Sequence, residues 1–269
     1  MAVLNSLKTQ LRDLLPKSYQ VPAKYWYGWL RGGLEPEMKC LRSLAGDQDL
    51  VIDVGGNRGI YTHHLWRLGA IIEVFEPNPI CLSVLAAWAV DKPAVHLHSV
   101  ALSSASGSAH LHIPIDEAGV EHDASASIEN TGSSNIRDVL VPLRTLDSYL
   151  FEDVKLIKID VEGHEQSVIM GAAATLHSSR PALLVEIEQR HNARPISEIF
   201  EQILAYGYQG FFMTGGRLTP LTEFDVYLHQ SMKHFDEDRG NYINNFLFLH
   251  NSRVDSGEYA GLLNSLLLT

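Results

Sequence analysis

The sequence predicts an α/β protein built on a mainly parallel β-sheet with helices on both of its faces. Short apolar segments, typical of strands buried on both sides, alternate with segments of helical character between about residues 50 and 250. Acidic or small polar residues lie at or near the ends of these strands, at Asp53, Glu76, Ser99, Asp160 and Glu186. The carboxyl ends of parallel strands share one edge of a sheet, where ligands bind. The sequence therefore predicts a binding site at that edge.

The expected elements follow from apolar spacing and turn residues. Strands are expected at 50–54, 71–75, 95–98, 139–143, 155–161, 181–187, 211–213 and 245–249. Helices are expected at 3–15, at 34–44, from Gly59 to about residue 68, at 80–90, at 164–177 with Gly171 inside, and at 196–206. Residues 103–135 are expected to form a hairpin and a loop. The expected organisation is a helical arm or cap, 1–46, and an α/β domain, 47–269, with an insertion at about 103–140.

Composition narrows the class of protein. A formal net charge of −11 over 269 residues argues against non-specific nucleic-acid binding, which needs clustered Lys and Arg. The two cysteines, Cys40 and Cys81, form no paired motif and indicate a reducing compartment, with the cytoplasm as the expected location. No apolar run reaches the roughly 18 residues of a membrane span.

The first 33 residues differ in charge from the rest of the chain. They carry one acid, Asp13, and five bases together with four clustered aromatic residues: Lys8, Arg12, Lys17, Lys24, Arg31, Tyr25, Trp26, Tyr27 and Trp29. The pattern fits a helical arm whose aromatic side chains pack on the main domain. It also fits peripheral contact with a membrane or a glycan, and both interpretations stay open.

The clearest motif joins the first strand to the following helix. It reads Asp53-Val54-Gly55-Gly56-Asn57-Arg58-Gly59 and differs from the G-x-G-x-x-G spacing of dinucleotide-binding loops. An acid two residues before the first glycine repels a pyrophosphate and attracts a ligand with a cationic end. Glu76 follows 21 residues after Gly55, where a carboxylate accepts ribose hydroxyl protons. The two features predict a site for an adenosine-like ligand, although a purely structural turn is the alternative for the loop.

Seven stretches together resemble the FkbM family of methyltransferases, in order along residues 50 to 250. They are VIDVGGNRGIYT, VFEPNP, SVALS (99–103), RTLDSYL (144–150), LIKIDVEGHEQSVIMGA (156–172), RPALLVEIE (180–188) and NNFLFLH (244–250). The resemblance implies a class I methyltransferase, Rossmann-like fold with a seven-stranded sheet. It also implies S-adenosyl-L-methionine as the methyl donor. Members of the family commonly methylate hydroxyl groups of sugars or of polyketide-type metabolites.

The resemblance also implies cofactor-binding residues. The loop around the methionine part would be formed by Asp53, Gly55, Gly56, Asn57 and Gly59. Glu76 would hold the ribose diol. The residues bordering the adenine would be Pro77, Asn78, Ser99, Val100 and Ala101.

A second group of ionisable residues follows two later strands, and such clusters at a strand end are typical of functional sites. The candidates for the base that receives the acceptor proton are Asp160, Glu186 and His164, in that order, with Glu162 beside them. For Lys158, Glu165, Glu188 and His191 a structural role remains an alternative. No metal is predicted. If a divalent ion were required, Asp160 and Glu186, with Glu162 and Glu188, would supply oxygen ligands. Trp26, Trp29, Phe211 and Phe212 are candidates to stack on a sugar.

The predicted function is O-methylation of a sugar or glycan hydroxyl, in a surface polysaccharide or glycolipid. A polyketide-type or other small-metabolite hydroxyl is the alternative acceptor. Alternatives from other classes are an NAD(P)-dependent sugar oxidoreductase and a non-catalytic binding protein. The G-x-G-x-x-G spacing that an oxidoreductase would need is absent from this sequence. No nucleic-acid partner is expected, and an oligomer remains open.

Overall fold

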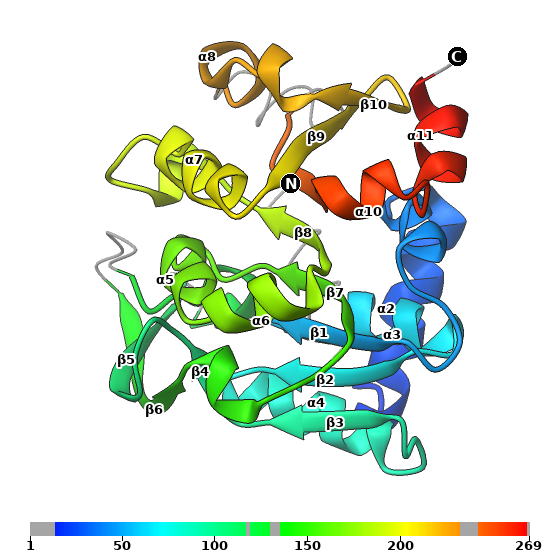
Figure 1. Cartoon of the computed structure of the whole chain (residues 1–269). Coiled ribbons are helices and arrows are strands. Elements are labelled where there is room, and N and C mark those ends of the chain that lie inside the picture. The colour runs from blue at the N-terminus through cyan, green and yellow to red at the C-terminus, as the bar shows by residue number, and fades with distance from the viewer. Residues whose placement is uncertain (1–13, 117–118, 130–134, 232–241, 268–269) are drawn as a thin grey trace.

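A large, mostly parallel sheet forms the centre of the molecule (Figure 1). The computed structural model describes residues 14–116, 119–129, 135–231 and 242–267. Within them the sheet has eight strands in the order β10-β9-β11-β8-β7-β1-β2-β3. Its strands are β1 (Leu50–Val54), β2 (Ile71–Phe75), β3 (Val95–His98), β7 (Val154–Ile159), β8 (Ala182–Glu186), β9 (Tyr208–Thr214), β10 (Arg217–Pro220) and β11 (Asn245–His250). Strand β11 runs antiparallel to β8 and β9, and β10 antiparallel to β9.

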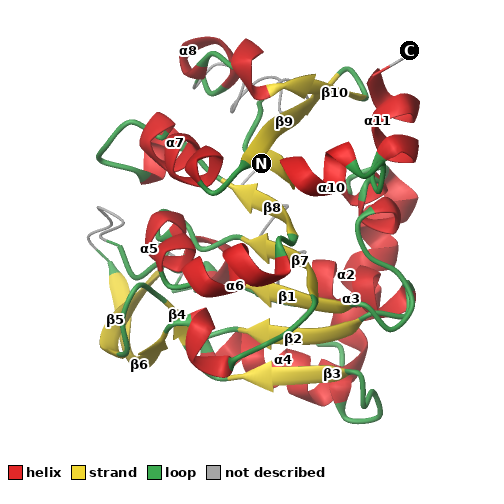
Figure 2. Cartoon of the chain, viewed as in Figure 1, coloured by secondary structure: helices red, strands yellow, loops and turns green. Residues whose placement is uncertain are grey.

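Helices cover both faces of this sheet (Figure 2). One core cluster joins the sheet to α2 (Lys17–Arg31), α3 (Ile60–Arg67), α4 (Pro79–Ala89) and α11 (Ala260–Leu267). The cluster on the other face includes α5 (Glu165–Met170), α6 (Ala173–Ser179) and α7 (Ser197–Ala205). The shorter helices are α8 (Val226–His229), α10 (Asn251–Asp255) and the 3₁₀ turns η1 (Pro36–Lys39), η2 (Leu41–Ser43), η3 (Asp123–Ser125), η4 (Leu146–Tyr149), η5 (Gln189–His191) and η6 (Leu221–Glu223). None of the described helices is long and apolar enough to cross a membrane.

The predicted fold class is confirmed, with one more strand in the main sheet than expected. The described sheet has eight strands instead of seven because Arg217–Pro220, for which no strand was predicted, pairs with β9 as a hairpin. The expected strand 155–161 ends at Ile159, so Asp160 and Val161 lie beyond the strand. The predicted helix 3–15 falls almost wholly outside the described residues.

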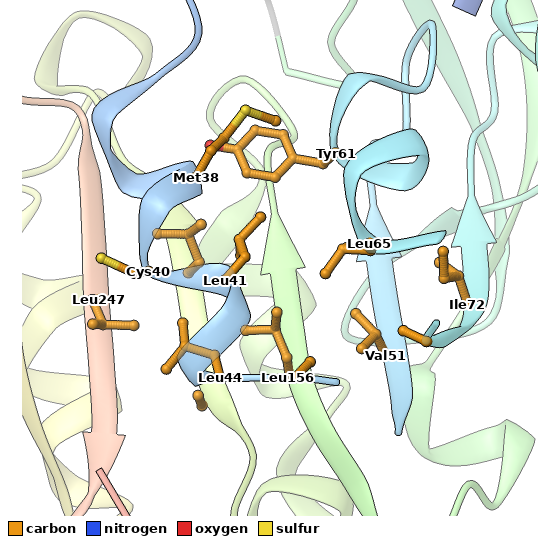
Figure 3. Close-up of a cluster of buried hydrophobic side chains, with 14 of the residues drawn as sticks. Met38, Cys40, Leu41, Leu44, Val51, Tyr61, Leu65, Ile72, Leu156 and Leu247 are labelled. Atoms are coloured by element: carbon orange, nitrogen blue, oxygen red, sulfur yellow. The ribbon is translucent and has the colours of Figure 1, made fainter. Parts of the chain in front are cut away.

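Two predicted helices were wrong in form. The segment 34–44 forms two 3₁₀ turns instead of one α-helix, and Met38, Leu41 and Leu44 on these turns are buried. Its backbone hydrogen bonds span three residues, as from Cys40 N–H to the carbonyl of Glu37 and from Leu44 N–H to that of Leu41. Figure 3 shows these side chains packed with Leu156 of β7 and Leu247 of β11. The segment 164–177 is broken at Gly171, where a Cβ atom would lie 2.0 Å from the carbonyl oxygen of Ser103.

The predicted insertion is a small second sheet. Strands β5 (Gly107–Pro114) and β6 (Ile136–Arg144) form an antiparallel hairpin, and β4 (Ala101–Leu102) pairs with β6. Ala101, Leu111, Ile113 and Val141 form its own core. In Figure 1 this sheet lies beside the ends at which β1 and β2 terminate, so its residues contribute to the site described below.

Candidate active site

The loop between β1 and α3 brings its backbone against the end of β7. Gly55 has a φ of 79°, and a Cβ atom there would lie 1.8 Å from the carbonyl oxygen of Asp160. Only glycine fits this position, because it tolerates positive φ and has no side chain to collide with the neighbouring strand end. The loop therefore forms an open bend at the carboxyl ends of β1 and β7.

Glu76 closes the other side of this bend. Its side chain is buried, and its two oxygens accept hydrogen bonds from the backbone N–H groups of Asn57, at 2.6 Å, and Asn78, at 2.7 Å. Burial raises the pKa of Glu76 to about 7, against the lowering effect of these hydrogen bonds. Each oxygen retains a further lone pair, so the carboxylate can also accept hydrogen bonds from the hydroxyls of a ribose.

A groove beside Glu76 has the chemistry expected for a nucleoside. Its walls combine apolar side chains, which suit the faces of a base, with a few polar groups. The lining residues are Val54, Gly55, Asn57, Phe75, Glu76, Pro77, Ala101, Leu102, Leu111, Asp123, Ala126, Ser127, Ile128, Asp160, Val161, Glu162 and His164. The residues present thus fit the adenosine part of S-adenosylmethionine.

The insertion narrows this groove. Arg58 is buried and donates from Nε and Nη2 to Oδ2 of Asp123, at 2.9 and 2.5 Å, and from Nη1 to the side chain of Gln20 on α2, at 3.0 Å. One guanidinium thereby links the glycine loop, the insertion and the N-terminal arm. The cavity volume left in the groove is about 50 Å³, which holds only a few water molecules.

A second and much larger cavity lies next to the groove. Its volume is about 770 Å³, within the usual range for small-molecule sites, and its lining is unusually polar. It is lined by Lys24, Gly32, Gly33, Leu34, Glu35, Pro36, Glu37, Asp53, Gly55, Gly56, Asn57, Arg58, Ile60, Tyr61, Ser125, Lys158, Asp160, Glu162, Glu186, Glu188, Arg190, Met213, Tyr242, Ile243, Asn244 and Asn245. We call it the acceptor cavity, and four of the residues predicted around the methionine part of the cofactor also line it: Asp53, Gly55, Gly56 and Asn57. Asp160 and Glu162 line both this cavity and the groove.

Lys158 and Asp160 form the charged centre of the acceptor cavity. The ammonium of Lys158 is buried, donates to Oδ1 of Asn245 at 3.1 Å and lies 4.0 Å from Oδ2 of Asp160. Burial lowers the pKa of Lys158, but the surrounding carboxylates outweigh this and hold it above its usual value. Burial raises the pKa of Asp160, and Lys158 is the main opposing influence. Asp160 is therefore a carboxylate with raised basicity, held beside a fixed positive charge.

Glu186 is a second carboxyl group close to Asp160. It ends β8 beside β7 and accepts a hydrogen bond from Nδ2 of Asn244 at 2.7 Å. Burial, and after it the negative charge of Asp160, raise the pKa of Glu186 well above its usual value. Of these two carboxyl groups, Glu186 is thus the one that holds a proton more readily.

A carboxylate from the N-terminal arm also reaches this cavity. Glu35 follows α2 and accepts hydrogen bonds from the hydroxyl of Tyr61 and, at 3.2 Å, from Nδ2 of Asn245. Tyr61 lies on α3, where its ring faces Met38 (Figure 3), and the Lys158 ammonium is 4.8 Å from the centre of that ring. Residues from the arm, α3, β7 and β11 therefore converge on one side of the cavity.

The two histidines named as possible bases are held by hydrogen bonds. His164 uses Nδ1 with Glu129, at 2.7 Å, and Nε2 with Ser103, at 2.9 Å, and it lines the groove but not the acceptor cavity. His191 pairs through Nδ1 with Glu162 at 2.8 Å. His164 therefore ties the insertion to the strand end of β7, and Asp160 is better placed to receive an acceptor proton.

Other predicted site residues have supporting positions. Asp53 is buried and accepts a hydrogen bond from Oγ1 of Thr62 at 2.5 Å, which fixes β1 to α3. Asn78 caps α4 through Ile80 at 3.0 Å. Of the predicted adenine-side residues, Pro77 and Ala101 line the groove, whereas Asn78, Ser99 and Val100 do not. Gly56 lines the acceptor cavity, and Gly59, at the start of α3, lines neither space.

The four aromatic residues predicted as sugar-stacking groups line neither described space. Phe211 and Phe212 are buried in the two core clusters, and Trp26 and Trp29 are on the exposed side of α2. Glu188 lines the cavity but pairs with Arg190 at 2.6 Å and with the hydroxyl of Tyr242 at 2.6 Å. Glu165 is buried and accepts from the backbone N–H of Gly163 at 2.8 Å.

Sequence reasoning missed the residues that reach the site from distant parts of the chain. They are chiefly Glu35, Tyr61, Asp123, Ser127, Asn244 and Asn245. Only the two asparagines carried a signal, because they open the last strand of the sheet next to Glu186. No spacing rule connects Glu35 or Asp123 to residues that follow β1 and β7.

A metal centre is not apparent in the part of the chain that the structure describes. No three His, Cys, Asp or Glu side chains there are grouped as ligands. Asp160 and Glu186, the pair considered for a divalent ion, are accompanied by the ammonium of Lys158 instead.

The fold and the site together are those of a class I methyltransferase: a groove beside Glu76, at the ends of β1 and β2, adjoins a larger cavity at the ends of β7 and β8. Residues 53–209 match the family described as Methyltransferase FkbM domain, and this range is more than half of the chain. The chain belongs to the FkbM family of S-adenosylmethionine-dependent methyltransferases, which confirms the resemblance seen in the sequence.

Several solved structures are similar in overall arrangement. The methyltransferase FkbM from Methylobacillus flagellatus shares 17% identity over 89% of this chain and 57% of its own, with a TM-score of 0.49. A TehB-like methyltransferase from Corynebacterium glutamicum shares 12% identity over 84% and 93%, with a TM-score of 0.43. The Aeropyrum pernix fibrillarin solved with S-adenosyl-L-methionine shares 12% identity over 79% and 72%, with a TM-score of 0.41. The chain spans 57% of the Methylobacillus protein. No curated protein matches it.

Proposed function

We propose that the protein transfers a methyl group from S-adenosylmethionine to a hydroxyl group of a sugar or glycan. The observation that carries the proposal is the position of Asp160. It lines both the nucleoside groove and the acceptor cavity, beside the buried ammonium of Lys158. A carboxylate at that junction is in reach of a hydroxyl that enters from the acceptor side.

S-adenosylmethionine, held by Glu76 and the loop after β1, would supply a methyl group carried on a positively charged sulfur. Asp160 receives the hydroxyl proton, because it is the more readily ionised member of the carboxyl pair and its raised pKa makes it a stronger base than an ordinary aspartate. Glu186, which holds a proton more readily, donates a hydrogen bond to an acceptor oxygen. Glu76 would hold the ribose hydroxyls of the cofactor and so help to position the methyl donor.

The polar lining supports a polyhydroxylated acceptor. Carboxyl and amide oxygens from Glu35, Asp160, Glu186, Asn244 and Asn245 surround one space. Each accepts hydrogen bonds from hydroxyl groups, and a sugar carries several hydroxyls on one small ring. A polyketide-type acceptor, which is more apolar, would leave many of these groups without partners, and this cost makes it the weaker candidate.

Two further parts of the proposal concern place and partners. Cys40 and Cys81 are both buried free thiols, which suits the reducing cytoplasm. Contact with a membrane surface through the N-terminal arm accounts for the exposed aromatic residues of α2.

The proposal is tested with the purified protein and isotopically labelled S-adenosylmethionine. The acceptor panel contains methyl glycosides, oligosaccharides and hydroxylated polyketide-type compounds, and mass spectrometry detects the labelled methyl ether. Labelled sugar products that require intact Asp160 are expected. Transfer to the polyketide-type compounds alone would reverse the order of the two acceptors. Stabilisation by a nicotinamide dinucleotide but not by S-adenosylhomocysteine in a thermal-shift assay would reject the whole assignment.

A further inference from the structure

The outward face of α2 is apolar, although it lies on the surface. Tyr19 is 64% exposed, Trp29 is 57% exposed and Leu30 is 74% exposed, with Trp26 and Tyr27 beside them at 40% and 51%. We call these five residues the outer face of α2. A surface helix usually buries one apolar stripe and presents polar side chains to solvent. Apolar side chains grouped on the solvent side mark a contact surface.

The inward face of the same helix is already occupied. Val21 and Tyr25 are buried, and the Tyr25 hydroxyl lies 2.8 Å from Nδ1 of His64. Gln20 receives a hydrogen bond from Arg58 at 3.0 Å. These contacts fix the helix on α3 and α4, so the apolar side chains outside are not a core stripe that has failed to dock.

The charge around this face is positive in an acidic protein. Helix α2 contains three bases and no acid, in a chain of net charge −11. Arg31 lies 5.8 Å above the ring of Tyr27 on the outer face, whereas Lys17 donates to Ser83 of α4 and Lys24 lines the acceptor cavity. Arg67 of α3 lies 4.6 Å above the ring of Trp26. Trp and Tyr side chains flanked by Lys and Arg are typical of helices that lie in the headgroup region of anionic membranes. At physiological salt, repulsion between anionic lipids and acidic residues more than a Debye length of about 8 Å away is largely screened.

We infer that the outer face of α2 docks onto an anionic lipid bilayer. The chain leaving α2, residues 32–36, lines the acceptor cavity, as does Lys24 on the helix itself. Docking therefore brings that side of the cavity to the lipid surface. This inference rests on the proposed function and specifies its acceptor as a sugar anchored to a lipid. The sugar ring enters the cavity while the acyl chain of the lipid stays in the bilayer.

Vesicle sedimentation tests the docking surface with the full-length protein. The vesicles are an equal mixture of phosphatidylglycerol and phosphatidylcholine, or phosphatidylcholine alone. Binding to the mixed vesicles is expected, with weaker binding when salt is raised or the anionic lipid is omitted. The double variant Trp29→Ser with Leu30→Ser is expected to need at least about tenfold more lipid for half-maximal binding.

A matched control uses an equally apolar pair elsewhere on the surface. Tyr227 and Leu228 of α8 are 88% and 57% exposed, so Tyr227→Ser with Leu228→Ser removes the same kinds of side chain. The control is expected to bind like the unaltered protein. Absence of binding by the unaltered protein, or equal binding by both double variants, would overturn the inference. Light scattering that shows a dimer converted to monomers by Trp29→Ser with Leu30→Ser would also overturn it, because a second copy would then cover the face.

The assay separates this inference from the proposed function. Transfer to a soluble methyl glycoside is expected to be unchanged in the Trp29→Ser, Leu30→Ser variant, while transfer to a sugar lipid in mixed vesicles falls at least about tenfold. Vesicle binding without any methyl transfer to sugars would reject the proposed function and leave the docking surface standing. Methyl transfer to soluble sugars without vesicle binding would support the proposed function and reject the docking surface.

Discussion

Replacing Glu76 with Gln is expected to weaken cofactor binding and to leave the fold in place. The carboxylate accepts the backbone N–H groups of Asn57 and Asn78 at 2.6 and 2.7 Å. A glutamine keeps one acceptor oxygen, but its NH₂ group meets the other N–H as a second donor. One unsatisfied buried donor costs about 1–3 kcal/mol, so the unfolding temperature should fall.

Cofactor binding is expected to weaken as well, through the hydrogen bonds that the ribose makes to Glu76. Two charge-assisted hydrogen bonds from the ribose hydroxyls weaken, and each contributes about 1.5–3 kcal/mol at most. Since the hydroxyls regain water when unbound and the substituted glutamine would still accept one bond, we expect a net loss of about 1.5–3 kcal/mol. The dissociation constant of S-adenosylhomocysteine should therefore rise roughly 10- to 150-fold in Glu76→Gln, as measured by calorimetry.

Glu73→Gln is the matched control. Glu73 lies on β2, the strand that Glu76 follows. It is similarly buried and pairs with His96 at 2.7 Å and His98 at 2.6 Å, but it does not line the groove. It should lower the unfolding temperature by a similar amount and leave the dissociation constant unchanged. The ribose role of Glu76 would be refuted if the dissociation constant of S-adenosylhomocysteine for Glu76→Gln lay within about twofold of the value for the unaltered protein.

Four further predictions concern the site. Asp160→Asn keeps the shape but cannot receive a proton, so turnover should fall about 10²- to 10⁴-fold while calorimetric affinity for S-adenosylhomocysteine is kept; undiminished turnover would remove Asp160 as the base. Turnover should fall as pH drops through the raised pKa of Asp160. Lys158→Met removes the main group that lowers this pKa, so the acid limb of the pH–rate profile should move to higher pH. An acid limb that stays in place or moves to lower pH would contradict the charge argument. Glu35→Gln should raise the acceptor KM and leave cofactor affinity unchanged, and an unaltered KM would place Glu35 outside the acceptor site. Arg58→Met should increase hydrogen exchange across residues 119–129 but not in β1, because Asp123 loses its buried partner; equal protection would show that this pair does not hold the insertion.

Cofactor binding should also depend on pH in a defined direction. Glu76 must be ionised to accept two ribose hydroxyls, and its pKa is raised to about 7. Affinity for S-adenosylhomocysteine should therefore be highest above pH 7 and fall by up to tenfold for each unit below it. Titration calorimetry between about pH 5 and pH 8 measures this, and an affinity that increases toward acid would reverse the sign.

The sequence was sufficient for the sheet and for placing Gly55 and Glu76 together at its edge. A buried strand ending at Val54, a glycine bend at Gly55 and an acid at Glu76 are local features, each within about 20 residues of the next. Local spacing also placed Asp160 and Glu186 at the ends of adjacent strands, because β7 and β8 are consecutive strands of the main sheet. The same rules failed at residues 34–44, where the chain forms two 3₁₀ turns in place of the expected α-helix, because the apolar spacing there fits both kinds of helix.

The acceptor side was decided by tertiary structure. Glu35 meets Asn245 across 210 positions of sequence, and Arg58 meets Asp123 across 65. Periodicity describes which face of one element is apolar, but it carries no information on which distant side chains converge when elements pack. The basic, aromatic arm was visible in the sequence, yet only packing shows that Val21 and Tyr25 turn inward and leave Trp29 and Leu30 outside. Burial of the opposite face of α2 is what makes that surface available to a partner.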